Sequence, residues 1–324
     1  MLQRLFGLLV AAVAIGGSLT AADAYPTKPI VVVVPFPAGA GPDVLARMLG
    51  ERLSARLGQP VVIENRPGAS GYVGAAAVTR AAPDGHTLLM TPNTLFIAPH
   101  LAPKATTAQV HVVKDFAPVI MPSQTAMVMV ANPSLGVKNA KELAALVKKQ
   151  PGLAFASSGN GSVLHIAGEL FKRSAGVDML HVPYRGIAPA IADVIGGHVK
   201  VTYAGLGPIA SYLNAGTLTA LATVEERRSP ALPDVPTAIE QGFPAVAVEG
   251  WYALMAPKDT PAEVVARLNS EINAILAMPE VGERIKNSGE IVLGGTPEAL
   301  AKRMQSDYER YGAAIVKELS ISAD

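Results

Sequence analysis

Short runs of β-branched residues alternate along the chain with longer stretches in which apolar residues recur every three or four positions. Residues 30–34 read Ile-Val-Val-Val-Val, which is typical of a strand buried on both faces of a sheet. Residues 43–57 carry an apolar stripe at helical spacing that ends before Gly58. The further elements expected in this part are strands at 61–64 and 86–90 and a helix at 72–81. This β-α-β-α-β order predicts a parallel sheet flanked by helices.

The same alternation restarts after residue 125 and predicts a second α/β unit. Its expected strands are 126–130, 153–156, 180–184, 199–203 and 218–223, and its expected helices are 140–149, 162–175, 189–195 and 208–214. The last part has one strand at 251–255 followed by helices at 261–276 and 296–311, which is too little sheet for a domain.

We therefore expect two lobes, with the last part of the chain packed against the first of them. The first lobe comprises residues 25–122 and 249–324, and the second comprises residues 123–248. The chain then crosses between the lobes near Ser123 and again near Glu249.

The N-terminus has the three-part pattern of a secretory signal peptide. Arg4 precedes an apolar run of about 11 residues, which is shorter than the roughly 20 residues that a membrane-spanning helix requires. Ala22 and Ala24 then supply small residues at the −3 and −1 positions of a cleavage site. We expect residues 1–24 to be removed, so that the mature protein starts at Tyr25 and lies in the periplasm.

Composition excludes several classes of function. The 27 Lys and Arg residues nearly balance the 26 Asp and Glu residues, which argues against nucleic-acid binding. Cysteine is absent, which removes disulfides, thiolate metal sites and thiol nucleophiles. The six histidines form no H-E-x-x-H motif and no close ligand pair, so no metal site and no cofactor is expected.

The loop between the first strand and the first helix is a candidate anion site. It reads Pro-Phe-Pro-Ala-Gly-Ala-Gly-Pro-Asp over residues 35–43. We expect free N–H groups at Gly39, Ala40 and Gly41, where the helix dipole favours negative charge. In a purely structural interpretation, the same loop is a tight turn in which glycine is needed for the backbone geometry, and Asp43 offsets the helix dipole. A dinucleotide fingerprint is incomplete, because its third glycine would fall at Val44.

The run Ala-Ser-Ser-Gly-Asn-Gly-Ser-Val-Leu-His at residues 156–165 is the second candidate. Ser162 reads as the N-cap of the following helix and His165 as its N3 residue. Backbone N–H groups, hydroxyls and an imidazole then converge on one helix N-terminus, which suits an anion. Two other interpretations stay open. Ser162 and His165 are a cap and a packing residue, or they are the nucleophile and base of an exported hydrolase, although no G-x-S-x-G motif is present.

At this point the mature chain resembles the extracytoplasmic solute receptors of the tripartite tricarboxylate transporter family, also called Bug receptors. The resemblance extends over about 300 residues. The matching stretches are residues 25–30, 35–39, 58–68, 83–85, 114–119, 157–162 with His165, 181–186, 233–237, 256–257 and 260–261.

The resemblance implies a type II periplasmic-binding-protein fold, with a small carboxylated solute bound in a cleft between two α/β lobes. It implies that the protein is not an enzyme and is a monomer, and that membrane permease subunits or a sensor protein are its partners. The resemblance also implies that residues 91–93, at the end of the third strand, line the same cleft. The ligand-binding residues expected in this way are Phe36, Ala38, Gly39, Ala40, Asp43, Thr91, Asn93, Ser157, Ser158, Gly159, Gly161, Ser162 and His165.

Two positions depart from the family pattern and leave the identity of the ligand open. Pro42 stands where the family usually has a threonine, so a hydroxyl donor is missing. Ala204 stands where the family often has an aspartate, so an acid that could meet a ligand amine is missing.

Overall fold

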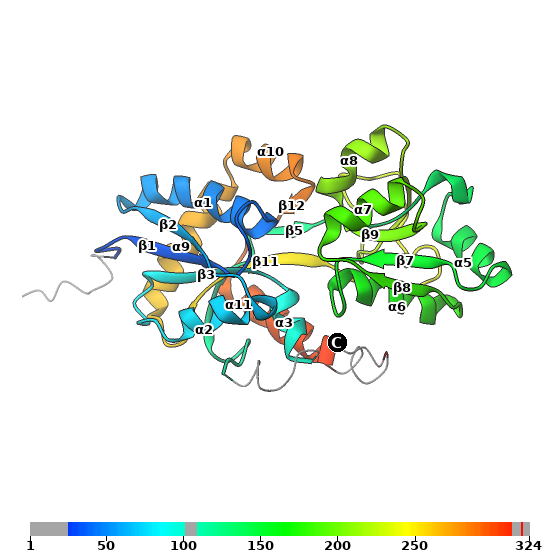
Figure 1. Ribbon diagram of the computed structural model, residues 1–324. Helices are drawn as coiled ribbons and strands as arrows, with labels where there is room; N and C mark the ends of the chain where they lie inside the picture. The colour runs from blue at the N-terminus through cyan, green and yellow to red at the C-terminus, as the bar shows by residue number, and fades with distance from the viewer. Residues whose placement is uncertain (1–24, 101–108, 313–318, 320–324) are drawn as a thin grey trace, which may run out of the picture.

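The computed structural model describes residues 25–100, 109–312 and 319, so the expected signal peptide at 1–24 lies outside the described residues. Two sheets lie side by side, and helices cover the faces of each (Figure 1). Within the described ranges, no helix is both long enough and apolar enough to cross a membrane.

The first sheet has the strand order β12-β5-β11-β3-β1-β2, and β4 pairs with β11 beside this path. Strands β1, β2 and β3 are parallel, whereas β11 runs antiparallel to β3, β4 and β5. The strands are β1 (Ile30–Val34), β2 (Val61–Asn65), β3 (Thr87–Pro92), β4 (Phe116–Ile120), β5 (Ser123–Thr125), β11 (Gly250–Pro257) and β12 (Glu290–Val292). The helices are α1 (Gly41–Leu57), α2 (Tyr72–Thr79), α3 (Thr94–Ile97), α9 (Ala262–Leu276), α10 (Pro279–Asn287) and α11 (Pro297–Tyr311).

The second sheet has the order β10-β6-β9-β7-β8. Strand β7 is parallel to β8 and β9, and β6 is antiparallel to β9 and β10. The strands are β6 (Met127–Ala131), β7 (Ala154–Ser157), β8 (Leu180–Pro183), β9 (Val201–Gly205) and β10 (Thr219–Thr223). The helices are α5 (Ala140–Lys149), α6 (Val163–Ala175), α7 (Ile187–Ile195) and α8 (Leu206–Asn214).

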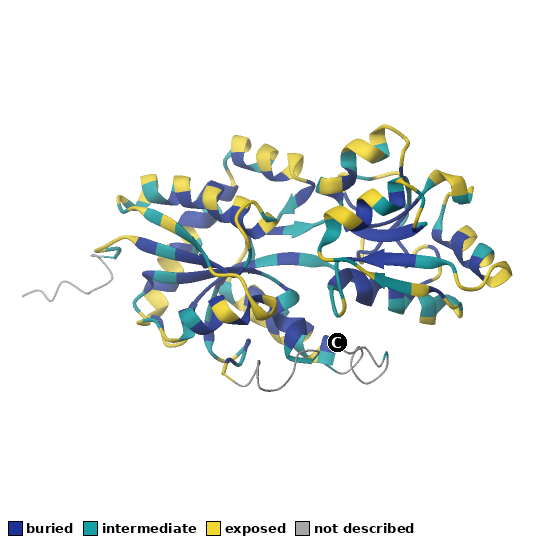
Figure 2. Ribbon diagram, viewed as in Figure 1, coloured by how far each residue is buried: buried dark blue, intermediate teal, exposed yellow. Residues whose placement is uncertain are grey.

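The strand β1 shows why a continuous β-branched run suits this position. Ile30, Val32 and Val34 belong to the core on one face of the sheet, and Val33 belongs to the core on the other face. Successive side chains of a strand point to opposite faces, so both faces need apolar residues. The inner strands are accordingly buried, the edge strands β2 and β8 are partly exposed, and the outer faces of the helices are exposed (Figure 2).

The expected elements are found with small shifts at their ends, and several further elements were not predicted. Strands β4, β5 and β12, the helix α3 and the helix α10 were missed. The first sheet is therefore mixed, because β11, β4, β5 and β12 extend its parallel part through antiparallel pairings. Strand β11 pairs with β3, as expected for a last segment that packs back on the first lobe. The lobe boundaries at 122/123 and 248/249 stay a prediction.

Candidate functional site

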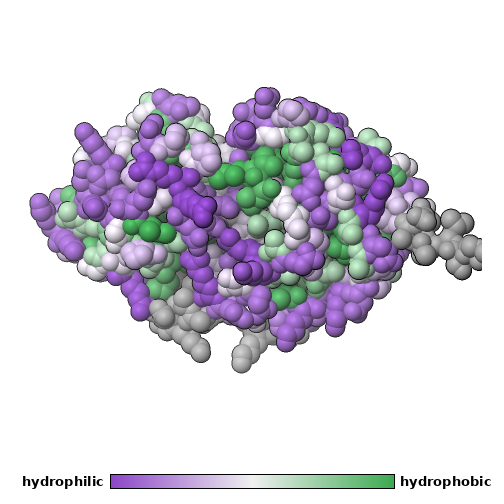
Figure 3. Space-filling model, turned by 180° about the vertical axis from the view of Figure 1, so that it is seen from behind, coloured by the Kyte–Doolittle hydropathy of each residue, from purple (hydrophilic) through white to green (hydrophobic). Residues whose placement is uncertain are grey.

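The two candidate loops follow parallel strands that point toward the junction between the sheets. The first loop continues β1 into α1, and the second continues β7 into α6 (Figure 1). Ligand sites of α/β sheets lie at the carboxyl ends of such strands. From behind, the surface is indented between the two halves at its upper edge (Figure 3).

Asp43 holds the first loop in shape from inside the protein. Its side chain accepts hydrogen bonds from the Gly39 N–H at 2.9 Å, from Arg47 Nε at 3.0 Å and from Asn65 Nδ2 at 2.9 Å. Burial raises the pKa of Asp43, but these hydrogen bonds and the Arg47 charge outweigh burial and lower the pKa overall. The ionised carboxylate therefore ties the loop to α1 and to the end of β2.

The prediction that Gly39, Ala40 and Gly41 all carry free N–H groups is wrong for the first two. The Gly39 N–H donates to Asp43, and the Ala40 N–H donates to the Pro37 carbonyl at 3.2 Å. Among the described residues, the Gly41 N–H has no protein acceptor. The start of α1 thus offers far fewer donors to an anion than the sequence suggests, although Phe36, Ala38, Gly39 and Ala40 are all at least partly exposed.

Tyr252 is a neighbour of this loop that the sequence did not single out. A Cβ added to Gly41 would lie 2.3 Å from the Tyr252 hydroxyl oxygen, so a side chain at position 41 would clash. Tyr252 lies on β11 opposite Pro92, and its hydroxyl also hydrogen-bonds the Thr125 side chain. Any side chain at position 41 would therefore require the Tyr252 ring to shift.

The N-terminus of α6 keeps its donors available. Ser162 is its N-cap, as predicted, and its Oγ accepts the His165 N–H at 3.2 Å. Within the described ranges, the N–H groups of Val163 and Leu164 have no protein acceptor. These are the first two helical positions, whose N–H groups point out of the helix end where the dipole favours an anion. Sequence reasoning missed both, although an N-cap serine predicts two unpaired N–H groups after it.

The other residues of the second loop divide into exposed and buried ones. Ser158, Gly159 and Gly161 are partly exposed, and both glycines have positive φ, at 131° and 68°. Ser157 is fully buried, and its hydroxyl is 2.6 Å from His181 Nε2 and 3.1 Å from the Gly159 carbonyl. Ser157 therefore supports the loop from behind.

His165 and His181 form a stacked pair beneath this loop. Their ring centroids lie 3.7 Å apart with an interplanar angle of 5°. The Gly161 N–H donates to His165 Nδ1 at 3.0 Å, so this ring supports the loop and makes no bond to the Ser162 hydroxyl. The nucleophile–base interpretation of Ser162 and His165 therefore finds no geometric support. Burial and the neighbouring imidazole and Lys172 charge lower the pKa of His165 to about 3, and burial lowers the pKa of His181 to about 4.

This histidine pair should make the protein less stable in acid. Both pKa values lie below the ordinary value of 6.5, so on acidification the unfolded chain binds protons at a higher pH than the folded protein does. The free energy of unfolding should then fall as the pH drops from 6.5 toward 4, by about 1.4 kcal/mol per histidine and pH unit. Urea unfolding of His181→Gln should show a weaker pH dependence than wild type, whereas the exposed His198→Gln should not. Equal slopes for His181→Gln and wild type would contradict this prediction.

Thr91 and Asn93, at the end of β3, are both buried. The Asn93 side chain donates to the Glu249 carbonyl at 2.8 Å, and its N–H donates to the Trp251 carbonyl at 2.9 Å. Thr91 Oγ1 donates to the Pro92 carbonyl at 3.2 Å. Asn93 thus fixes the start of β11, which is where the chain returns to the first sheet.

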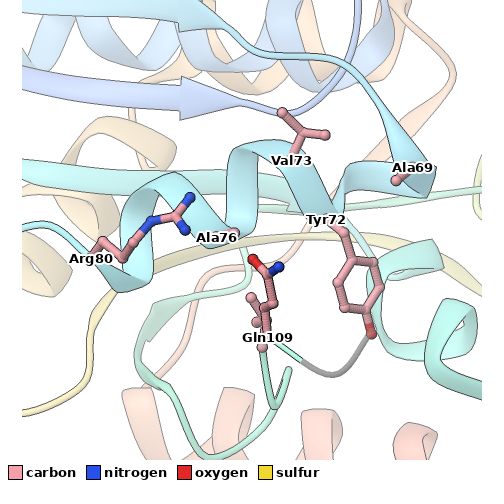
Figure 4. A pocket seen from close by; sticks show the side chains of 7 residues that line it. Ala69, Tyr72, Val73, Ala76, Arg80 and Gln109 are labelled. Atoms are coloured by element: carbon pink, nitrogen blue, oxygen red, sulfur yellow. The ribbon is translucent and has the colours of Figure 1, made fainter. Parts of the chain in front are cut away.

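A surface pocket beside the first sheet is lined by no residue of either loop. Its lining residues come from α2, from the residues directly before and after that helix, and from residues 109–110, with Arg80 at one end and Tyr72 at the other (Figure 4). None of the expected ligand-binding residues lines it.

The fold has two α/β lobes, each with a loop and a helix N-terminus at their junction, and its connecting segments pair as β5 and β11. This arrangement defines a solute-binding protein of the periplasmic type. Comparison with known proteins agrees. The sequence profile of the tripartite tricarboxylate transporter family receptor matches residues 45–321, and the chain belongs to this family. Its proteins bind substrates in the periplasm and are not enzymes.

The similar proteins include one curated relative and two solved structures. Protein BugT of Bordetella pertussis is 35% identical over 318 residues, which cover 98% of this chain and 97% of BugT. The structure of R. palustris Rpa4515 with adipate is 31% identical with a TM-score of 0.80, covering 92% of this chain and 99% of that chain. MatC (Rpa3494) from Rhodopseudomonas palustris with bound malate is 33% identical with a TM-score of 0.75, and the match covers 89% of this chain and 99% of that chain.

Proposed function

We propose that this receptor captures a small carboxylate-bearing metabolite between its lobes and delivers it to a tripartite tricarboxylate-type permease. The N-terminus of α6 carries the proposal, because the Val163 and Leu164 N–H groups and the Ser162 hydroxyl form a donor set for one carboxylate. Each hydrogen bond to a charged group contributes about 1.5–3 kcal/mol. Adipate and malate, the ligands of the two related structures, are both small carboxylates.

The remaining parts of the proposal concern export and motion. Residues 1–24 direct the chain to the periplasm and are removed. The lobes, 25–122 with 249–324 and 123–248, close on the ligand by bending at the crossings near Ser123 and Glu249. In this arrangement the partly exposed Ser158, Gly159 and Gly161 and the loop 36–41 line the cleft. Asp43, Ser157 and His165 hold these loops in place from behind, whereas the buried Thr91 and Asn93 lie at the end of β3, where Asn93 fixes the start of β11.

A thermal-shift screen against small carboxylates, adipate and malate included, tests this function. A ligand at 100 times its dissociation constant adds about 2.7 kcal/mol to the free energy of unfolding. We expect at least one carboxylate to raise the melting temperature, and we expect a chelator to leave that shift unchanged. A screen in which no carboxylate stabilises the protein, or in which the chelator abolishes the shift, would argue against the proposal.

A further inference from the structure

Two buried glutamates flank the short strand β5, along which the chain passes from the first sheet to the second. Glu290 on β12 accepts a hydrogen bond from the Ser123 hydroxyl at 2.5 Å. Glu225, just after β10, accepts one from Gln124 Nε2 at 3.2 Å. Glu290 thus belongs to the first sheet, whereas Glu225 follows a strand of the second. Two neighbouring residues of β5, Ser123 and Gln124, therefore hydrogen-bond carboxyl groups that come from the two different sheets.

Glu225 lacks the partners that a buried carboxylate requires. The residue is 2% exposed, and its Oε2 has no hydrogen-bond partner within the described chain. The Met127 N–H and Gln124 are its donors. The charged group that faces it is another carboxylate, Glu249, whose own charge is paired with Arg303 at 2.7 Å. An unpaired buried charge is costly, so this environment favours the neutral acid.

Glu290 is in a similar position on the other side of β5. The residue is 9% exposed, and its neighbours are the Ser123 hydroxyl and the phenol of Tyr252 on β11. No lysine or arginine in the described ranges forms an ion pair with Glu225 or Glu290. Both sites therefore lack a counter-charge.

We infer that β5 is a proton-sensitive joint between the lobes: protonated Glu225 and Glu290 hold the crossing as seen here, and their ionisation loosens it. Burial raises the pKa of each group to about 7 from an ordinary 4.5, and this effect outweighs the hydrogen bonds from Gln124 and Ser123, which favour the ionised form. The nearby Glu249 charge raises the pKa of Glu225 further. Such a group favours the buried arrangement at low pH, and this preference is lost as the pH rises through about 7. The inference rests on the proposed function only in assuming that the lobes move at these crossings.

The absence of cysteine allows the joint to be tested by site-specific labelling. Ala55→Cys on α1 and Ser211→Cys on α8 are exposed positions on the two lobes for a pair of spin labels. Double electron–electron resonance without added ligand should give a longer or broader interlobe distance near pH 8.5 than near pH 5.5. The Glu225→Gln/Glu290→Gln variant, which mimics the neutral acids, should keep the low-pH distribution at both pH values.

The matched control is Glu226→Gln/Glu280→Gln, which changes two exposed glutamates and should respond to pH like the wild type. A wild-type distribution that does not change with pH, or a change that persists in Glu225→Gln/Glu290→Gln, overturns the inference. If that variant fails to fold, a ¹³C carboxyl titration of the wild-type protein decides, because two glutamates must ionise near pH 7. Adding adipate at pH 5.5 tests the proposed function separately. If adipate does not change the interlobe distance, this result counts against ligand binding but not against the pH response.

Discussion

Gly207→Ala is expected to hold the two lobes apart and to weaken ligand binding by roughly 5- to 150-fold. Gly207, at the start of α8, lies against the backbone of Ser288 and Gly289 in the turn before β12. A Cβ at position 207 would lie 2.2 Å from the Ser288 carbonyl oxygen, and that backbone has no flexible end that could move aside. Overpacking of this kind costs about 1–3 kcal/mol, which gives the stated range in affinity.

The control for this substitution is Gly282→Ala on α10, where an added Cβ would have no neighbour within 4 Å. It changes the same residue type on the first lobe without touching the second. Small-angle scattering with a stabilising carboxylate should show compaction for wild type and Gly282→Ala, and little or none for Gly207→Ala. Wild-type compaction and affinity in Gly207→Ala would show that this contact is not part of closure.

The parallel part of the first sheet could be predicted because its strands contain unbroken apolar runs, such as Ile-Val-Val-Val-Val in β1. Strand β1 has the predicted bounds, and α5 does as well, since Asn139 caps it and Lys148 and Lys149 end it. Strand β5 could not be predicted in the same way. It has three residues, Ser-Gln-Thr, with no apolar run, and it forms because β11 and β12 pair with it from distant parts of the chain.

The local geometry of the candidate loops could be predicted only in part, and their role in ligand binding stays a prediction. Ser162 was correctly placed as a cap, because an N-cap is a local feature that depends on the next three residues. The role of Asn93 depends on Glu249, 156 residues further along the chain, and the sequence holds no signal of that contact. The Asp43 carboxylate likewise needs Asn65, which only the parallel pairing of β1 and β2 brings near.

The second large effect is expected at Ser162. Replacing it with alanine removes a hydroxyl donor to the ligand carboxylate, worth about 1.5–3 kcal/mol, so affinity should fall roughly 10- to 150-fold. The lost cap costs about 1 kcal/mol of stability as well, so binding must be measured on protein shown to be folded. Ser162→Asp separates the two effects, because aspartate retains the cap but places a negative charge where the carboxylate binds.

The matched control is Thr296→Asp at the N-cap of α11, which changes a cap in the same way on a helix that takes no part in the proposed site. This variant should bind the ligand as wild type does. It also shows whether one additional negative charge on the protein is enough to weaken carboxylate binding.

Isothermal titration calorimetry of Ser162→Asp, with the carboxylate that most stabilises the wild-type protein, tests the central claim most directly. If the N-terminus of α6 binds the ligand carboxylate, Ser162→Asp binds more weakly than Ser162→Ala while unfolding with near wild-type stability. If Ser162→Asp binds that carboxylate as tightly as wild type does, the carboxylate is not held at the N-terminus of α6.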